Sequence, residues 1–447
     1  MAVNYLSNKA QEVMGDKPTA ISPGYEAAPS GETMEALTWH GVRDVRMATV
    51  PKPTVSDAND AVIRITGSTV CGSDLHLYHG EILQLKQGDV LGHEAIGVVE
   101  QVGDAVRTIK VGDRVVCSFS ISCGQCDMCK RDLGSMCDVV NKSSVMDKLY
   151  GKKIGGVLGY GHFLGGFAGA QSEAMRMPFA DRNCFKVPDS LPDEKALYLS
   201  DIVCTSYHSV VDVDFQPGET AAIWGAGPIG LNLCQWLKPD LFNAKKVILV
   251  DNDVHRLAFA RDRFGVETIN FDEVKDVAAA IQELVPIGVD VSFDAAGFRY
   301  AKTALHKAMR AVALETDSPE VLNEAIRATR KFGKISIAAD YAGTTNGFLI
   351  GALMERGIQL KGNGQAPTQR YIPKLMKEYL EPGRFDPTII LTHRFKLEDT
   401  AEIYAAFDEK RFDESKGVGL LKCFVETKHS FPRAEGTPEL SKIPERT

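Results

Sequence analysis

The sequence contains no apolar run that approaches the roughly 20 residues needed for a membrane-spanning helix. It also lacks a basic excess: the net charge is −8 at pH 7, so nucleic acid and anionic membrane surfaces are not expected partners. Residues 1–33 carry Lys9 and Lys17 but no apolar core of a secretory signal, and the final Glu-Arg-Thr is not a peroxisomal address. These absences predict an intracellular protein, with the cytoplasm as the expected location.

The composition that remains is typical of a globular protein with more than one domain. The 447 residues are long for a single core, and 44% hydrophobic with 25% charged residues lies in the globular range. We find no internal repeat. The ten cysteines could suggest disulfides, but four of them crowd into Cys123–Cys137. In an intracellular protein of this size, such crowding indicates a metal site.

One stretch, Ile223 to Asp251, organises the rest of the chain. An apolar strand leads into Gly225, Gly227 and Gly230, a helix-like run follows, and a second apolar strand ends at Asp251. The first glycine permits a tight turn, the second lets the backbone approach a pyrophosphate, and the third lets the helix pack close to the sheet. The helix start would hold phosphates, and Asp251, about twenty residues on, would accept from a ribose hydroxyl. A glycine-rich surface turn is the alternative, but this order and spacing favour a dinucleotide-binding unit.

The chain before this unit is β-rich. Ala61–Val70 alternates enough to predict a half-buried strand, and Met34–His40, Ala95–Val102 and Arg114–Cys117 are strand-like runs split by glycines. Short strands with glycine turns predict a partly closed barrel. Residues 1–33 are polar and are expected to order only by docking or to stay flexible.

From about Lys195 to Gln365 the pattern changes to alternating strands and helices. The expected elements are helices at Val254–Phe264, Val274–Val285 and Pro319–Phe332, and strands at Val289–Asp294 and Lys334–Ala338. This alternation predicts a parallel sheet with right-handed crossovers, and Phe298–Ser318 is expected to be an insertion in it. After residue 365, an amphipathic Tyr371–Leu380 and a strand-like Leu420–Val425 are assigned back to the first domain.

The motif Cys123-x2-Cys126-x2-Cys129-x7-Cys137 can wrap one tetrahedral ion. Because four thiolates leave no open position, that ion would be a structural zinc. Iron–sulfur ligation also uses closely spaced cysteines, but no other redox signature accompanies this spacing.

Cys71, His93 and Glu94 are hard to explain by packing alone. A catalytic zinc takes a few protein ligands and keeps one exchangeable position, and a thiolate and an imidazole suit it. A structural cysteine and a core histidine are the alternative, which the four-cysteine motif and the dinucleotide unit together disfavour. A structural role is favoured for the remaining histidines considered, which are His79, His162, His208 and His393.

These motifs together resemble the zinc-dependent, medium-chain alcohol dehydrogenase family. The resemblance runs from about Met34 to Val425 and is carried by Cys71-Gly-Ser-Asp-Leu-His76, by Gly92-His93-Glu94, by the four-cysteine lobe and by the glycine fingerprint. Within the family, Leu199-Ser-Asp-Ile202, Gln171-Ser-Glu173 and the insertion after Asp294 are most similar to the glutathione-independent formaldehyde dehydrogenase branch.

The resemblance implies an α/β fold with a GroES-like, β-rich catalytic domain and a Rossmann cofactor domain with a doubly wound parallel sheet. The expected bounds are 1–33 for an N-terminal extension, 34–200 for the first part of the catalytic domain with a structural zinc lobe at 117–140, and 201–365 for the NAD-binding domain. Residues 366–427 would return to the catalytic domain, and 428–447 would form a polar tail. The family is usually dimeric or tetrameric, so a homodimer or homotetramer is expected.

The resemblance also implies roles for matching residues. Cys71, His93 and Asp201 would bind the catalytic zinc, with Glu94 or Cys204 as alternatives for the third ligand, and Glu94 would lie close to the ion. Asp74 would orient His93, while Ser73 and His76 would relay a proton. The cofactor would be held by Thr205, Gly225, Gly227, Pro228, Ile229, Gly230, Asp251 and Arg256.

The expected function is a zinc-dependent oxidoreductase that moves hydride between an alcohol or hydrated aldehyde and NAD, with two zinc ions per chain and no fixed substrate identity. A polyol or secondary-alcohol dehydrogenase with Glu94 as a ligand is one alternative. A non-catalytic dinucleotide-binding protein is another, although it would need neither Ser73 nor His76. The carboxylate of Asp251 favours NAD, because it would face the 2′-phosphate of NADP with like charge. Arg256 is the one feature that favours NADP.

Overall fold

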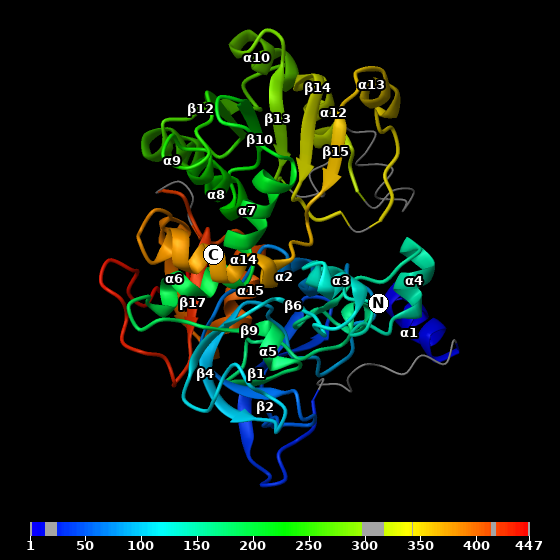
Figure 1. The fold of residues 1–447 in the computed structure, drawn as a ribbon, viewed down its shortest axis with the longest axis vertical. Helices are drawn as coiled ribbons and strands as arrows, with labels where there is room; N and C mark the ends of the chain where they lie inside the picture. The colour runs from blue at the N-terminus through cyan, green and yellow to red at the C-terminus, as the bar shows by residue number, and fades with distance from the viewer. Residues whose placement is uncertain (1, 14–24, 297–316, 342, 413–416, 446–447) are drawn as a thin grey trace. The chain divides into compact units, whose positions relative to one another are not determined.

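The computed structural model describes residues 2–13, 25–296, 317–341, 343–412 and 417–445 (Figure 1). The chain forms two compact units. The first contains Met1–Cys204, Pro367–Asp413 and Leu420–Thr447, and the second contains Thr205–Ala366 and Glu414–Gly419. Most of the insertion expected at Phe298–Ser318 lies outside the described residues.

The first unit is built on a seven-stranded sheet. Its order is β16 (Leu391–Lys396), β17 (Lys422–Glu426), β3 (Ala61–Ser68), β4 (Ala95–Val102), β5 (Arg114–Cys117) and β9 (Cys184–Lys186), and β8 (Ala174–Met177) also pairs with β3. All these pairs are antiparallel except β16 with β17. Two small sheets accompany it, β1 (Thr33–Gly41) with β2 (Asp44–Pro51), and β6 (Ser120–Ile121) with β7 (Gly156–Val157). The β-rich character predicted for this part of the chain is confirmed.

Strand β3 differs from its prediction as half-buried. Every residue of β3 except Arg64 is buried. Ile63 and Ile65 pack into one apolar cluster on one face, and Val62 packs into another cluster on the opposite face. The strand therefore lies inside the unit with both faces covered. Its C-terminal end, Ser68, is followed closely in the chain by Cys71.

Short helices connect these strands. They are α2 (Asp74–Tyr78), α3 (Asp127–Lys130), α4 (Ser144–Tyr150), α5 (Ala180–Asn183), α6 (Asp193–Ala196), α14 (Thr368–Leu375) and α15 (Thr400–Asp408), while α7 (Ile202–Asp212) follows a 3₁₀ turn at Leu197–Ser200. The polar N-terminal extension contains a helix, α1 (Ala2–Val13), which the sequence analysis did not anticipate. It is docked, since Asn4 Nδ2 donates to the carbonyl of Leu85 at 2.7 Å.

The second unit is a six-stranded, wholly parallel sheet. Its order is β12 (Glu267–Asn270), β11 (Lys246–Asp251), β10 (Thr220–Trp224), β13 (Val289–Asp294), β14 (Thr329–Ile337) and β15 (Gln359–Gly362). In chain order this is 3-2-1-4-5-6, the Rossmann arrangement. The helices are α8 (Pro228–Trp236), α9 (Val254–Phe264), α10 (Val277–Leu284), α12 (Glu320–Ala328) and α13 (Ile350–Glu355), shown around the sheet in Figure 1. The predicted doubly wound α/β unit is confirmed.

One predicted helix boundary in this unit is wrong. The helix expected to reach Phe332 ends at Ala328, and Thr329 already begins β14. The Thr329 hydroxyl donates to the carbonyl of Ala325 at 2.7 Å and so occupies an acceptor at the helix end. The chain then pairs with β13, which a continued helix could not do.

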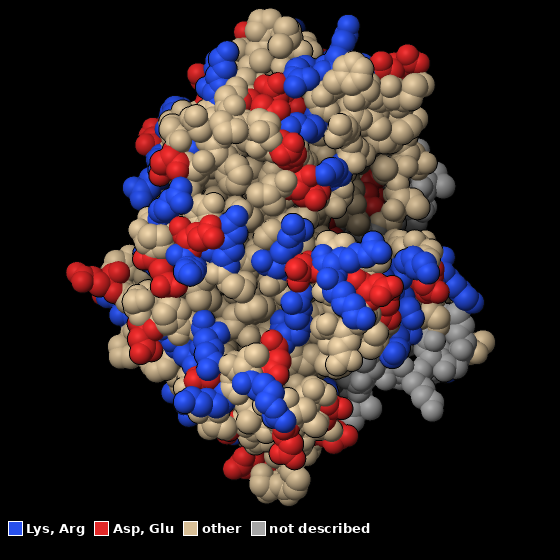
Figure 2. All heavy atoms as spheres, in the orientation of Figure 1, with Lys and Arg blue, Asp and Glu red and all other residues tan. Residues whose placement is uncertain are grey.

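Among the described residues, no helix combines the length and apolar character that a membrane crossing requires. The face drawn in Figure 2 carries Lys and Arg interspersed with Asp and Glu rather than a field of one sign.

Candidate active site

Four potential metal ligands converge in the first unit. Cys71 follows β3 and His93 and Glu94 precede β4, so the antiparallel pairing of Ser68 with Ala95 brings these two segments to one end of the sheet. Asp201, between the 3₁₀ turn and α7, completes the group. One ligand atom from each of Cys71, His93, Glu94 and Asp201 lies within 4.8 Å of the others. His93 Nε2 is 3.4 Å from an Asp201 oxygen and 3.9 Å from Glu94 Oε1.

The imidazole of His93 is held from its other nitrogen. Its Nδ1 is 3.0 Å from Asp74 Oδ1, and the second oxygen of this fully buried carboxylate accepts from the Cys71 N–H at 2.8 Å. Nδ1–H therefore donates to Asp74, and Nε2 is turned toward the cluster. Burial alone would lower the pKa of His93, but Asp74 and Asp201 raise it well above its usual value. A cation at Nε2 would take the place of that proton.

Gln171 braces this arrangement. Its Nε2 donates to the Thr69 carbonyl at 3.0 Å and to Asp74 at 3.4 Å, and its Oε1 accepts from the Tyr404 hydroxyl at 2.9 Å. The residue before His93 must be glycine, because Gly92 has φ +94° and a Cβ there would lie 2.5 Å from the Gln171 side chain.

Lys422 is part of the site, and sequence reasoning missed it. Its side chain on β17 is 1% exposed, and its ammonium pairs with Glu94 Oε1. Burial alone would lower the pKa of Lys422, but Cys71, Glu94 and Asp201 together raise it well above its ordinary value. The signal in the sequence was a single lysine within the apolar run from Leu420 to Val425.

The second oxygen of Glu94 tests whether a metal fits this cluster. Glu94 Oε2 is buried and has no hydrogen-bond partner among the described residues. A buried carboxylate oxygen without a partner is costly, and burial raises the pKa of Glu94. A thiolate, an imidazole and carboxylates around one point are the donor set that zinc binds. The residues therefore fit a zinc ion, with Glu94 beside it.

Cys204, the other alternative ligand considered, does not belong to the cluster. Its thiol donates to the carbonyl of Leu199 at 3.0 Å, and burial raises its pKa well above the usual range. This is the environment of a structural cysteine.

Ser73 and His76 lie close to Cys71 in the chain, at the start of the short helix α2 and within it. Ser73 precedes the first residue of α2, and a spacing of three places both side chains on one side of the turn. His76 Nδ1 is 3.0 Å from Glu81 Oε2, a contact that sequence reasoning also missed. Two histidines predicted to be structural pair with acids, His79 with Asp408 at 2.6 Å and His162 with Asp89 at 3.2 Å.

The four-cysteine lobe forms a second candidate metal site. The Sγ atoms of Cys123, Cys126, Cys129 and Cys137 all lie within 4.8 Å of one another. Backbone N–H groups of Gln125 and Cys126 approach the Cys123 sulfur at 3.4 Å, as expected around thiolates. Burial alone would raise the pKa of Cys126, but backbone donors lower it to about 7. Four converging sulfurs with N–H donors fit a tetrahedral zinc ion.

The glycine fingerprint of the second unit has the expected geometry. Gly225 adopts φ +100°, and a Cβ on it would lie 2.7 Å from the Ala295 carbonyl oxygen. A Cβ on Gly230 would lie 1.8 Å from the Gly225 carbonyl oxygen. Gly227 caps α8, which begins with Pro228 and Ile229, and a Cβ there would meet nothing within 4 Å. The open approach at Gly227 is what a pyrophosphate needs.

The acid at the end of β11 faces this turn. Asp251 Oδ2 accepts from the Ala226 N–H at 2.6 Å, and Oδ1 accepts from the N–H groups of Asn252 and Asp253. Arg256 is occupied, since its Nε lies 3.1 Å from Asp253 and donates to the Val418 carbonyl at 3.2 Å. Thr205, the residue expected near the nicotinamide, is buried on α7.

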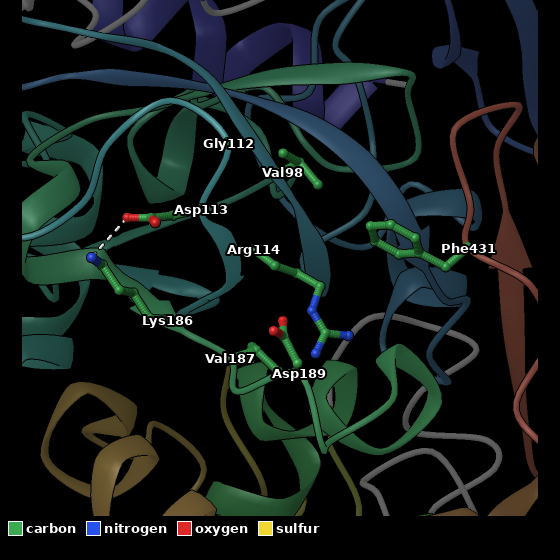
Figure 3. A pocket seen from close by; sticks show the side chains of 8 residues that line it. All are labelled: Val98, Gly112, Asp113, Arg114, Lys186, Val187, Asp189 and Phe431. Atoms are coloured by element: carbon green, nitrogen blue, oxygen red, sulfur yellow. Dashed lines mark ion pairs between the residues drawn. The ribbon is translucent and has the colours of Figure 1, made fainter.

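A separate hollow of about 490 Å³ lies elsewhere in the first unit (Figure 3) and contains none of the cluster residues. Its two cations are already paired: Lys186 with Asp113 at 2.8 Å, and Arg114 with Asp193 at 2.8 Å. It offers no cluster of reactive groups.

Comparisons with known proteins agree with this geometry. The family described as "Alcohol dehydrogenase GroES-like domain" matches residues 57–189, and "Zinc-binding dehydrogenase" matches residues 228–314. A zinc-type alcohol dehydrogenase-like protein of Schizosaccharomyces pombe is 42% identical over 94% of this chain and 99% of its own length.

Two further relatives extend the comparison. The glutathione-independent formaldehyde dehydrogenase of Pseudomonas aeruginosa is 30% identical over 89% of this chain and 98% of its own. The structure of the alcohol dehydrogenase TADH from Thermus sp. ATN1 matches 88% of this chain and all of its own, with TM-score 0.72 and 29% identity. The chain is therefore an oxidoreductase that belongs to the zinc-dependent, medium-chain alcohol dehydrogenase family.

Proposed function

We propose that this protein is an NAD-dependent zinc enzyme that oxidises a small alcohol or hydrated aldehyde, with formaldehyde-like compounds as the substrate class. The observation that carries the proposal is the cluster of Cys71, His93, Glu94 and Asp201, two of them buried and two half-buried, in a chain that also has a complete dinucleotide fingerprint. The likeness to a formaldehyde dehydrogenase over 89% of the chain supports the substrate class.

In this proposal Cys71, His93 and Asp201 hold the catalytic ion, and the four-cysteine lobe holds a structural one. A zinc ion bound at the first site supplies Lewis acidity that lowers the pKa of the substrate hydroxyl. Asp74 keeps the proton of His93 on Nδ1, which leaves Nε2 free to act as a ligand. Lys422 anchors one oxygen of Glu94 and so limits how far that carboxylate can turn toward the ion.

Ser73 accepts the proton of the substrate hydroxyl and passes it toward the imidazole of His76, a side chain suited to proton transfer. Glu81 Oε2 lies 3.0 Å from His76 Nδ1 and so orients the imidazole in this relay. The carboxylate of Glu81 stabilises the imidazolium of His76 that forms when the ring takes up the proton. The chain thus supplies a route by which the proton can leave the buried site.

The choice of NAD rests on Asp251. Its carboxylate lies at the end of β11 against the fingerprint turn, where the adenosine ribose is expected. Arg256, the cation that could have favoured NADP, is engaged by Asp253. A 2′-phosphate would therefore meet a carboxylate without a ready counter-ion.

A panel of alcohols and aldehydes, assayed with NAD and with NADP at the reduced-nicotinamide absorbance, tests the function. We expect turnover of small aldehydes, and a preference for NAD of at least about a hundredfold in kcat/KM, which corresponds to roughly 2.7 kcal/mol. Asp251→Ser should narrow that ratio through better use of NADP. No turnover of any member by the zinc-loaded protein would refute the enzyme assignment, and equal use of both cofactors would refute the role of Asp251.

Glu94 keeps a second candidate open, a polyol or secondary-alcohol dehydrogenase in which this carboxylate is the third ligand. The observation that favours it is the buried Glu94 Oε2, which has no hydrogen-bond partner among the described residues. Zinc analysis of Asp201→Ala and Glu94→Gln separates the two. Loss of one zinc in Asp201→Ala, with Asp201→Cys retaining it, supports the first candidate. Loss in Glu94→Gln alone supports the second.

A further inference from the structure

A buried acid ends the central strand of the cofactor sheet. Asp294 is the last residue of β13, is fully buried, and lies beside the fingerprint turn. The contact is close: a Cβ on Gly225 would lie 2.7 Å from the Ala295 carbonyl oxygen, and the Ala295 N–H donates to the Trp224 carbonyl at 2.9 Å. A buried carboxyl costs free energy unless its oxygens are hydrogen-bonded, so the partners of Asp294 are informative.

Asp294 ties together the segments that follow two neighbouring strands. Its Oδ2 accepts from the Tyr341 hydroxyl at 2.7 Å, and its Oδ1 accepts from the Ala296 N–H at 3.1 Å. Its backbone carbonyl accepts from the N–H groups of Ala338 and Ala339, both at 2.9 Å. Residues 295–296, which follow β13, and residues 338–341, which follow β14, are therefore both held to Asp294.

Other acids surround this contact and use their oxygens in the same way. Asp317 accepts from the Gly343 N–H at 2.8 Å, and Glu324 accepts from the indole of Trp224 at 3.0 Å. Burial raises the pKa of Asp294 to about 6, although the Tyr341 hydroxyl opposes that rise. A carboxyl kept at such a cost is typical of a position that serves a site rather than the core.

The topology indicates which part of a dinucleotide would meet these segments. The sheet order is β12-β11-β10-β13-β14-β15, with the fingerprint turn after β10. Asp251 ends β11 and marks the adenosine side of the turn. Because a Rossmann sheet binds the two nucleotide halves on opposite sides of this crevice, the nicotinamide half belongs above the ends of β13 and β14.

We propose that Asp294 and Tyr341 are a positioning pair for the nicotinamide half of the cofactor. The hydrogen bond between the Tyr341 hydroxyl and the Asp294 carboxylate holds residues 295–296 and 338–341 in the shape that receives the nicotinamide ribose and ring, without touching the reacting atoms. This inference rests on the proposed function, because it requires that the second unit binds a dinucleotide.

The test compares two ligands on the full-length protein by calorimetric titration. NADH uses both halves of the site, whereas ADP uses the adenosine half alone. In Tyr341→Phe we expect NADH to bind about tenfold more weakly, since a hydrogen bond to a charged group is lost from the pre-formed site. ADP should bind within about twofold of the unmodified protein. Asp294→Asn should weaken NADH less, because the amide can still donate to the tyrosine oxygen.

Thr220→Val is the matched control at the opposite end of the neighbouring strand β10. The Thr220 hydroxyl donates to Asp290 at 2.7 Å, near the start of β13 and away from the strand ends that would receive cofactor. This variant should lose thermal stability as Tyr341→Phe does, yet keep the NADH-to-ADP affinity ratio.

The outcomes separate this inference from the function on which it rests. Unmodified protein that binds neither ADP nor NADH would overturn both. Binding of both ligands by the unmodified protein, with an unchanged affinity ratio in Tyr341→Phe, would overturn the positioning pair alone. An equal fall of the NADH-to-ADP affinity ratio in Thr220→Val would also overturn the positioning pair, because the effect would then reflect the general stability of the sheet.

Discussion

Removal of the Lys422 ammonium should show how strongly Lys422 and Glu94, the buried pair at the candidate active site, are energetically coupled. Lys422→Met keeps most of the side-chain length and removes the charge opposite Glu94. The side chains of this pair are 1% and 0% exposed, so neither charge can be taken up by water. Breaking a buried pair by removing one partner costs about 3–5 kcal/mol, and we expect that range for the zinc-free protein.

The matched substitutions make this expectation a thermodynamic cycle. Glu94→Gln should cost less than Lys422→Met, because Cys71 and Asp201 still face the ammonium and stabilise its charge. The double variant leaves no unpaired charge, so the coupling energy should be about 2–3 kcal/mol, within the range seen for contacting groups. Lys186→Met is the control in the same unit, since the Lys186 side chain is 53% exposed and its pair with Asp113 should contribute no more than about 1 kcal/mol.

Urea denaturation of the four proteins after chelation gives the cycle, and the rate of zinc release to a chelator gives its consequence. Without Lys422, the Glu94 carboxylate is free to turn to the ion, so the variant should release its catalytic zinc more slowly than the unmodified protein. The coupling would be refuted if Lys422→Met lowered the free energy of unfolding by less than about 1 kcal/mol and the effects of the two single substitutions were additive. Faster zinc release would refute the idea that Lys422 restrains Glu94.

Three further predictions concern other parts of the chain. Cys126→Ser should lose one zinc by metal analysis and lower stability while the catalytic ion remains, since a structural ion is coupled to the folding of its lobe. Asp74→Ala should weaken catalytic zinc binding by about 10–100-fold in competition with a chelator, because His93 loses the partner that orients it. Burial raises the pKa of Asp294 to about 6, so native protein retains a proton that the unfolded chain has released, and stability falls as pH rises from about 4 to about 6. Asp294→Asn should remove about 2 kcal/mol of the difference in unfolding free energy between pH 4.5 and pH 7.5, measured by urea denaturation. The same pH dependence of stability in this variant and in the unmodified protein would contradict the burial argument.

The parts of the fold that sequence reasoning predicted are those with a local signature. The glycine fingerprint, the strand before it and the helix after it occupy consecutive residues, and Gly225 and Gly230 each have a steric reason in neighbouring backbone. The spacing of Cys123 to Cys137 is local in the same sense, because a single lobe closes on itself. The alternation of strands and helices from about Lys195 to Gln365 was sufficient to predict the parallel sheet.

The missed features depend on residues far apart in the chain. Lys422 and Glu94 are separated by 328 positions, and a lysine in a strand is usually solvated, so nothing local pointed to a partner. Tyr341 and Asp294 are likewise joined only when β13 and β14 pair. The end of α12 at Ala328 was missed because helix propensity continues past it, and pairing with β13 overrides that propensity.

Two polar pairs, each with a buried carboxyl, show where this chain departs from the rule that sheets close over apolar residues. Each pair lies at a strand and links segments far apart in sequence, Glu94 with Lys422 in the first unit and Asp294 with Tyr341 in the second. Neither carboxyl is stable there by itself, since burial raises the pKa of both. Apolar residues would hold the same strands at lower cost, so stability alone does not account for the choice. A hydrogen bond is directional and an apolar contact is not, so a polar pair fixes the relative orientation of two segments as well as their distance. Both proposed sites require a fixed orientation of the segments that form them.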